Sequence, residues 1–115
     1  MNRVTSGFFV AALIRRINGS GGFAAVLRKG AEEAGAIALV FRDREGGLTL
    51  FRPAPQTAYG EGSGERRFAA MVGAGDQEHI DAALARKARF DSDLWVVEVE
   101  TGGAPPETYI DIMPT

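Results

Sequence analysis

The chain has 115 residues, of which 45% are hydrophobic and 24% are charged, as in an ordinary soluble globular protein. A chain of this length supports one hydrophobic core, so we expect a single domain. The sequence contains no cysteine, which excludes disulfides, thiolate metal sites and cysteine nucleophiles and fits a reducing cytoplasm. The longest apolar run, Phe8 to Ile14, is far shorter than the roughly 20 residues of a membrane span.

Charge is distributed unevenly along the chain. Residues 1–60 hold eight basic and four acidic side chains, a local charge of +4. Residues 61–115 hold five basic and eleven acidic side chains, a local charge of −6, so the two halves sum to the formal net charge of −2. This polarity could steer a charged partner, but attraction between the halves within one fold explains it more simply.

The N-terminal part of the chain predicts a helix followed by a strand. Thr5 or Ser6 can cap a helix that runs to about residue 17, and the glycine-rich segment that follows ends it. Residues 23–28 then predict a first strand, and residues 29–35 a connection.

A β-hairpin is the centre of the predicted fold. Large side chains at Ile37, Leu39 and Phe41 alternate with smaller ones at the intervening positions, so the strand should have two unlike faces. A polar turn over residues 43–47 contains two glycines, and a second strand over residues 48–51 runs back along the first. The prolines that follow end the hairpin, because proline cannot donate to a sheet ladder.

The second half of the chain predicts a strand, a helix and a final strand. A loop over residues 53–64 leads into a strand over 66–72, and the glycine-containing turn at 73–75 follows. Asp76 can cap a helix over residues 77–90, whose last turn carries several cations that suit the helix dipole. Residues 94–99 predict the last strand.

These elements predict an α+β (mixed α/β) fold: a small, mostly antiparallel sheet of four to five strands with two packed helices. Residues 1–100 should form the single globular domain, and residues 101–115 a C-terminal tail that can dock on it. The last strand can lie parallel to a neighbour through a right-handed crossover. The predicted core contains Leu13, Leu39, Phe41, Leu50, Trp95 and Val97.

The most interesting polar cluster is the acidic turn Asp91-Ser92-Asp93, next to Trp95. Two carboxylates in one turn could bind a divalent cation or position a base. The alternative is that Asp91 and Asp93 accept hydrogen bonds from turn amides, which is the commoner role. A metal would need a third carboxylate, for which Glu33 and Glu98 are the available candidates.

A second group of candidates is basic. Arg66 and Arg67 precede a predicted strand and could bind a phosphate or a carboxylate, or could pair with Glu33 or with the acidic turn. No glycine-rich phosphate loop or aromatic-basic pattern supports nucleotide or RNA binding. His79 is the only histidine, so it makes a poor metal site. We therefore assign no catalytic residue, no metal ligand and no cofactor.

Five segments spaced along the chain carry a family resemblance. They are Arg15-Arg16, AEEAGAI at 31–37, FRPAPQTAY at 51–59, ERRF at 65–68 and FDSDLWVVEVE at 90–100. As a spaced set, over about residues 6–100, they resemble a small bacterial family known only as domain-of-unknown-function 1491. The resemblance implies a cytoplasmic single-domain α/β protein without an assigned activity. It also implies that the proline-containing loop, the arginine pair and the acidic turn belong to one surface.

The leading functional hypothesis is a cytoplasmic, non-enzymatic binding module for a protein partner or a small anion. Its candidate surface contains Glu33, Arg66, Arg67, Asp91, Asp93 and Trp95. The alternative is an enzyme of unassigned class that uses Asp91 and Asp93, with or without a divalent metal. Nucleic-acid binding by the basic N-terminal half is a weaker third hypothesis, and we expect neither nucleic acid nor membrane as a partner.

Overall fold

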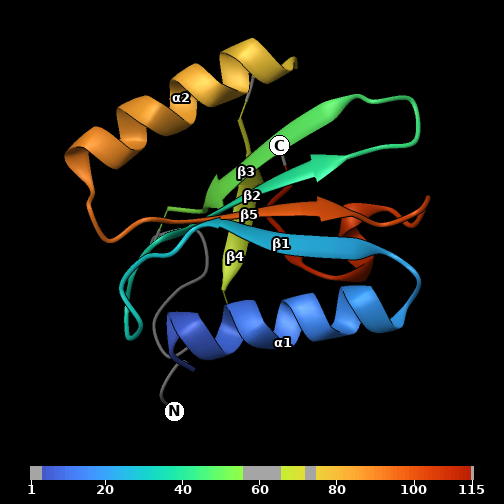
Figure 1. The fold of residues 1–115 in the computed structure, drawn as a ribbon, viewed down its shortest axis with the longest axis horizontal. Helices are drawn as coiled ribbons and strands as arrows, with labels where there is room; N and C mark the ends of the chain where they lie inside the picture. Colours follow the sequence, from blue (N-terminus) through green and yellow to red (C-terminus); the bar gives the residue numbers. More distant parts are fainter. Residues whose placement is uncertain (1–3, 56–65, 72–74, 115) are drawn as a thin grey trace.

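Figure 1 shows the fold in a computed structural model, which describes residues 4–55, 66–71 and 75–114. Helix α1 spans Ser6–Gly19, and Thr5 caps it by accepting the Phe8 amide at 3.2 Å. Most of the expected 53–64 loop and of the 73–75 turn lies outside the described residues. No helix in the described ranges is long and apolar enough to cross a membrane.

The strands form one sheet. They are β1 (Phe23–Arg28), β2 (Ile37–Arg42), β3 (Leu48–Pro53), β4 (Arg67–Ala70), β5 (Trp95–Glu100) and β6 (Asp111–Ile112), in the spatial order β1-β5-β2-β3-β4-β6. The predicted hairpin is present as the antiparallel pair β2–β3, in which Leu39 lies opposite Phe51. The final long strand is parallel to β2, with Leu39 opposite Val97.

The sheet differs from the predicted one in size and in strand direction. Within the described residues it has six strands rather than four to five, and it is mixed rather than mostly antiparallel, because β2–β5 and β4–β6 are parallel pairs. Strand β5 follows a helical crossover, and such a connection allows it to enter between β1 and β2 in the parallel sense. Strand β6 has only two residues, too few for any periodicity to reveal.

Each face of the sheet has its own apolar cluster, so the molecule has three layers: α1, the sheet and helix α2 (Gln77–Phe90) (Figure 1). The large β2 residues Ile37, Leu39 and Phe41 lie in the α1-side cluster, and the smaller Ala38 and Val40 lie in the α2-side cluster. All the predicted core residues are buried. Leu13, Leu39, Phe41, Trp95 and Val97 belong to the α1 side, whereas Leu50 belongs to the α2 side.

The C-terminal segment contacts the α1 side of the sheet. A short 3-10 helix, η2 (Pro106–Thr108), is followed by Ile110, which is buried in the α1-side cluster. Arg16 of α1 donates hydrogen bonds to the backbone oxygens of Thr108 and Tyr109, each at 3.2 Å. Strand β6 then pairs with β4. The C-terminal segment therefore forms hydrogen bonds and apolar contacts with α1 and with the sheet.

Among the strands that the structure describes, β1 lies at one edge of the sheet, paired with β5. The amide of Ala24 donates to the side-chain oxygen of Asn18 at 3.0 Å, so the last turn of α1 satisfies a group on this edge. An irregularity in the register follows between Val26 and Arg28. The edge strand is therefore partly capped by a side chain, and its regular pairing is interrupted near its end.

Candidate functional site

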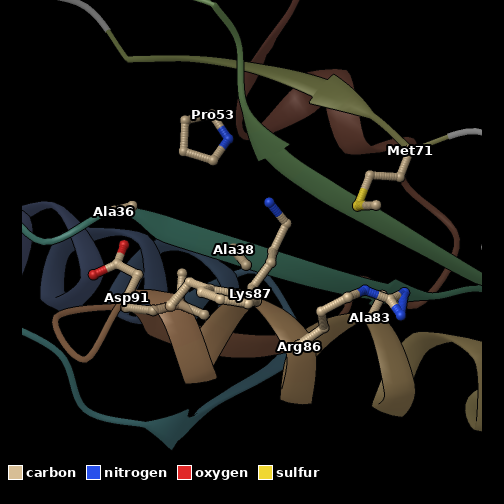
Figure 2. Close-up of a pocket in the computed structure, with 10 residues that line it drawn as sticks. Ala36, Ala38, Pro53, Met71, Ala83, Arg86, Lys87 and Asp91 are labelled. Carbon is tan, nitrogen blue, oxygen red and sulfur yellow. The ribbon is translucent and has the colours of Figure 1, made fainter.

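A cavity of about 470 Å³ lies between α2 and the sheet (Figure 2). The cavity forms because the two faces of the sheet carry side chains of different size along this segment. Ala36 and Ala38, on the α2 side, have small side chains, whereas the residues on the α1 side are large. Pockets of roughly 300–1,000 Å³ are typical of ligand sites. The residues that line this one are Ala36, Ala38, Pro53, Met71, Ala83, Arg86, Lys87, Phe90, Asp91 and Leu94.

The face of helix α2 that is turned to the cavity is buried in the first part of the helix and exposed at its end. Ile80 and Ala83 are buried against the sheet, and the same stripe continues at helical spacing to Lys87 and Phe90. Phe90 lines the cavity, yet 82% of its surface is exposed to solvent. A helix face that begins as core therefore ends as an open apolar and cationic surface.

Two cations stand at this cavity without a counter-ion from the described part of the chain. Neither Arg86 nor Lys87 makes an ion pair or a side-chain hydrogen bond there. In Figure 2 the Lys87 side chain leaves α2 and extends toward the side formed by Pro53 and Met71. The cavity therefore has a largely apolar lining, with the cations Arg86 and Lys87 beside it and the carboxylate of Asp91 at one end.

The acidic turn joins α2 to β5 at one end of this cavity. The carboxylate of Asp91 accepts the backbone amide of Asp93 at 2.9 Å, which is the turn-stabilising role. The backbone oxygen of Asp93 accepts from Ala31 at 3.0 Å, and the Trp95 indole donates to the Ala31 oxygen at 2.7 Å. Of the candidate residues, Asp91 thus lines the cavity, while Trp95 is buried on the other side of the sheet.

Glu33 and Arg66 lie near the first turn of α1. The backbone oxygen of Glu33 accepts the Ser6 amide at 3.1 Å, and Arg66 donates to the Ser6 hydroxyl at 3.2 Å and to the Val4 oxygen at 3.0 Å. Arg66 also lies over the ring of Phe9, 5.5 Å from its centroid. It lines a separate cavity of about 360 Å³ on the α1 side. The candidate residues Arg66 and Asp91 therefore line different cavities.

Arg67 contacts the C-terminal segment. Its Nε lies 3.1 Å from a carboxylate oxygen of Asp111, an acidic residue that sequence reasoning did not include among the candidate partners of the arginine pair. The pair joins the first residue of β4 to the first residue of β6, which are opposite each other in the sheet. This contact ties the C-terminal segment to the end of the sheet that carries the arginine pair.

No group of three or more histidine, cysteine, aspartate or glutamate side chains within the described ranges is arranged to hold a metal ion. His79 pairs with Asp76, whose carboxylate oxygen lies 2.8 Å from its Nδ1. Both side chains are exposed at the start of α2 and are not among the residues that line the cavity.

Sequence reasoning did not identify Arg86, Lys87 and Phe90 as site residues. The cations at the end of a helix are explained by the helix dipole, so they gave no separate signal. The available signal was Phe90, an aromatic residue at a core-facing helical spacing directly before an acidic turn. The exposure of Phe90 depends on the small size of the alanines on the opposite side of the cavity. The local sequence of α2 does not show which residues lie there.

The sequence profile of the proteins of unknown function DUF1491 matches residues 4–105. The chain belongs to the DUF1491 family. The match confirms the predicted resemblance. It extends a few residues beyond each end of the predicted range of about 6–100. No functionally curated protein matches the sequence significantly.

Solved structures similar to this DUF1491 chain come from two bacteria. The solution structure of protein Atu0922 from A. tumefaciens has 46% sequence identity and a TM-score of 0.84, over 98% of this chain and 97% of that one. A crystal structure of a DUF1491 family protein from Caulobacter crescentus CB15 has 37% identity and a TM-score of 0.79, over 95% and 98% of the two chains. An NMR structure of a DUF1491 protein from the same organism has 35% identity and a TM-score of 0.77, over 96% and 97%. The DUF1491 fold is thus shared along nearly the whole chain.

Proposed function

We propose that this DUF1491 protein is a non-enzymatic binding module of the cytoplasm, and that its site is the cavity between α2 and β2. The ligand carries negative charge on an otherwise apolar body. The observation that supports this most strongly is the pairing of an apolar cavity with two cations, Arg86 and Lys87, which have no counter-ion in the described part of the chain. The lack of cysteine favours the cytoplasmic location.

The shape and the charge of the cavity support this class of ligand. Its floor consists of the small side chains of Ala36, which is half-buried, and of Ala38, which is fully buried, so an apolar group would rest on Ala36 and the residues around it. Burial of that group contributes roughly 25 cal/mol per Å² of apolar surface removed from water. An anionic group at the cationic side gains charge-assisted hydrogen bonds, which are stronger in a partly desolvated site than in water.

The helix dipole supplies a competing explanation for the cations. Basic residues in the last turn of a helix interact favourably with its C-terminal carbonyls, whether or not a ligand binds. This effect does not account for Phe90, which stands at the same cavity with most of its surface in water. A ligand-binding role accounts for both features, so we prefer it.

An NMR titration with octanoate tests the proposal. Octanoate should shift the amide resonances of Ala38 and Lys87 in a saturable manner, and octanol, which lacks the charge, should bind more weakly. Lys87→Gln should raise the dissociation constant for octanoate about tenfold, equivalent to roughly 1.4 kcal/mol. Ala38→Leu, which fills the cavity, should remove the binding.

The control for this titration is Arg15→Gln, which removes an exposed cation from α1 on the other side of the sheet. It should leave the affinity for octanoate unchanged. Absence of saturable shifts at the cavity would overturn the proposed function, as would equal affinity for octanoate and octanol.

A further inference from the structure

We infer that the natural occupant of the α2 cavity is a segment of a partner protein, acidic in composition, that inserts one large apolar side chain. This inference rests on the proposed function and specifies the ligand. The surface concerned, here called the α2 platform, consists of the cavity with Arg86, Lys87, Arg89 and Phe90.

The exposure of Phe90 points to an occupant larger than the cavity. Phe90 lines the cavity, while 82% of the residue surface is in water. A small molecule enclosed in the cavity would leave most of this surface exposed. A protein segment that lies across the mouth would cover more of it, and exposed aromatic residues are enriched in protein interfaces.

The cations also extend beyond the cavity. Arg86 and Lys87 line it, but Arg89 does not and lies exposed in the same last turn of α2. A single carboxylate can be reached by the side chains beside the cavity, whereas Arg89 could pair only with a charge further along the surface. A polypeptide with several acidic residues around its apolar anchor supplies such charges over the required length.

The cavity accommodates an apolar side chain of the partner. Its floor and walls are formed by methyl groups, by Pro53 and by the thioether of Met71, which adapts its shape to an inserted group. A leucine or phenylalanine anchor inserted here would pack against Ala36, Pro53 and Met71, which remain accessible to solvent. The cations around the cavity would fix the orientation of the bound segment, because a segment bound in another orientation would leave its carboxylates without cationic partners.

The experiment is an NMR titration with short capped peptides that carry leucine or phenylalanine between runs of glutamate. Three comparison probes accompany them: the same peptides with alanine at the centre, the same peptides with lysine in place of glutamate, and octanoate. The acidic peptides with an apolar centre should perturb the resonances of Ala38, Lys87 and Phe90. The lysine-containing peptides should not bind.

Two matched variants separate a specific platform from general stickiness. Phe90→Ser should raise the dissociation constant of the peptide by roughly tenfold or more, as for an interface hot spot. Phe8→Ser removes a phenylalanine that is 62% exposed on α1 and should leave peptide binding unchanged. Unaltered melting temperatures would show that both variants are folded.

The outcomes distinguish this inference from the proposed function. If octanoate binds with dependence on Lys87 while no acidic peptide binds, the inference is overturned and the proposed function stands. If neither ligand binds, both are overturned. If the peptides with alanine at the centre bind as tightly as those with leucine or phenylalanine, the surface recognises charge alone and the apolar anchor is refuted.

Discussion

The side chain of Asp76 determines where α2 begins. Its carboxylate accepts the backbone amide of His79 at 2.9 Å, and the Nδ1 atom of the same histidine lies 2.8 Å away. The backbone hydrogen bond, and after it the side-chain hydrogen bond, lower the pKa of Asp76 below its ordinary value of 3.8. The cap therefore stabilises the helix in the ionised state of this residue.

This cap predicts an acid-dependent loss of stability. A carboxyl group whose pKa is lower in the folded state contributes stability above its unfolded value and loses it as pH falls through the folded value. Asp76→Ala should therefore lower the melting temperature at neutral pH, and its difference from the parent should shrink below pH 3.8. Asp76→Asn, which keeps a capping oxygen but does not ionise, is the control. A difference that widens on acidification would contradict this.

The carboxylate of Asp91 supports a prediction about metals. Mg²⁺ and Ca²⁺ need roughly six or more oxygen ligands, whereas Asp91 already accepts the amide of Asp93. Calorimetry should therefore show binding of either ion no tighter than about millimolar. A low-micromolar dissociation constant that Asp91→Asn abolishes, and that His79→Gln leaves intact, would favour an enzyme that uses this turn.

Among the elements, the β2–β3 hairpin carries the strongest test of register. Leu39 is fully buried on the α1 side, opposite Phe51 on one neighbour and Val97 on the other. Leu39→Ala should reduce the free energy of unfolding by about 2–5 kcal/mol, measured by urea denaturation. Glu45→Ala, in the exposed turn, should cost far less. Equal urea midpoints for the two variants would mean that Leu39 is not a core residue.

The C-terminal segment makes a similar prediction for an element outside the predicted domain. Ile110 is buried against the α1-side cluster, after two prolines and a short 3-10 helix. Ile110→Ala should cost about 2–5 kcal/mol of unfolding free energy, because it creates a cavity beside α1. Glu107→Ala in the exposed part of η2 is the control. Thermal denaturation compares them, and unchanged stability in Ile110→Ala would show that this segment contributes little to the fold.

The sequence predicted most of the secondary-structure elements, but it did not predict the α2 cavity. Alternation placed β2 and β3, and caps at Thr5 and Asp76 placed both helices, because these signals lie within a few neighbouring residues. The two-residue strand β6 has no such signal. The α2 cavity depends on the volumes of residues far apart in sequence, Ala38 and Ala83 among them. Local patterns contain no information on whether such residues meet.

For the molecule as a whole, the opposite charges of the two halves are partly combined in one sheet. Arg42 of β2 lies 3.5 Å from Glu98 of β5, an ion pair between the basic and the acidic half. This pair places a basic side chain of the first half beside an acidic side chain of the second. Neighbouring charges of opposite sign weaken the positive field that would attract a polyanion.

Weak binding to nucleic acids is therefore expected. Carboxylates of the segments 76–81 and 91–100 would oppose phosphates, so association with random duplex DNA or RNA should be weaker than micromolar at about 150 mM salt. Fluorescence anisotropy with a labelled duplex measures this. Micromolar binding that weakens steeply with added salt would instead support nucleic-acid recognition by the N-terminal half.

The hydrogen bond from Ala24 to Asn18 has a consequence for assembly. An outermost strand with unoccupied amides is a template on which another polypeptide can add, and repeated addition leads to fibrils. Here the helix that precedes the strand supplies an acceptor for one of these amides, that of Ala24, from within the same molecule. The register irregularity between Val26 and Arg28 interrupts the regular pairing near the end of the strand. Both features make the β1 edge a less regular template for an added strand.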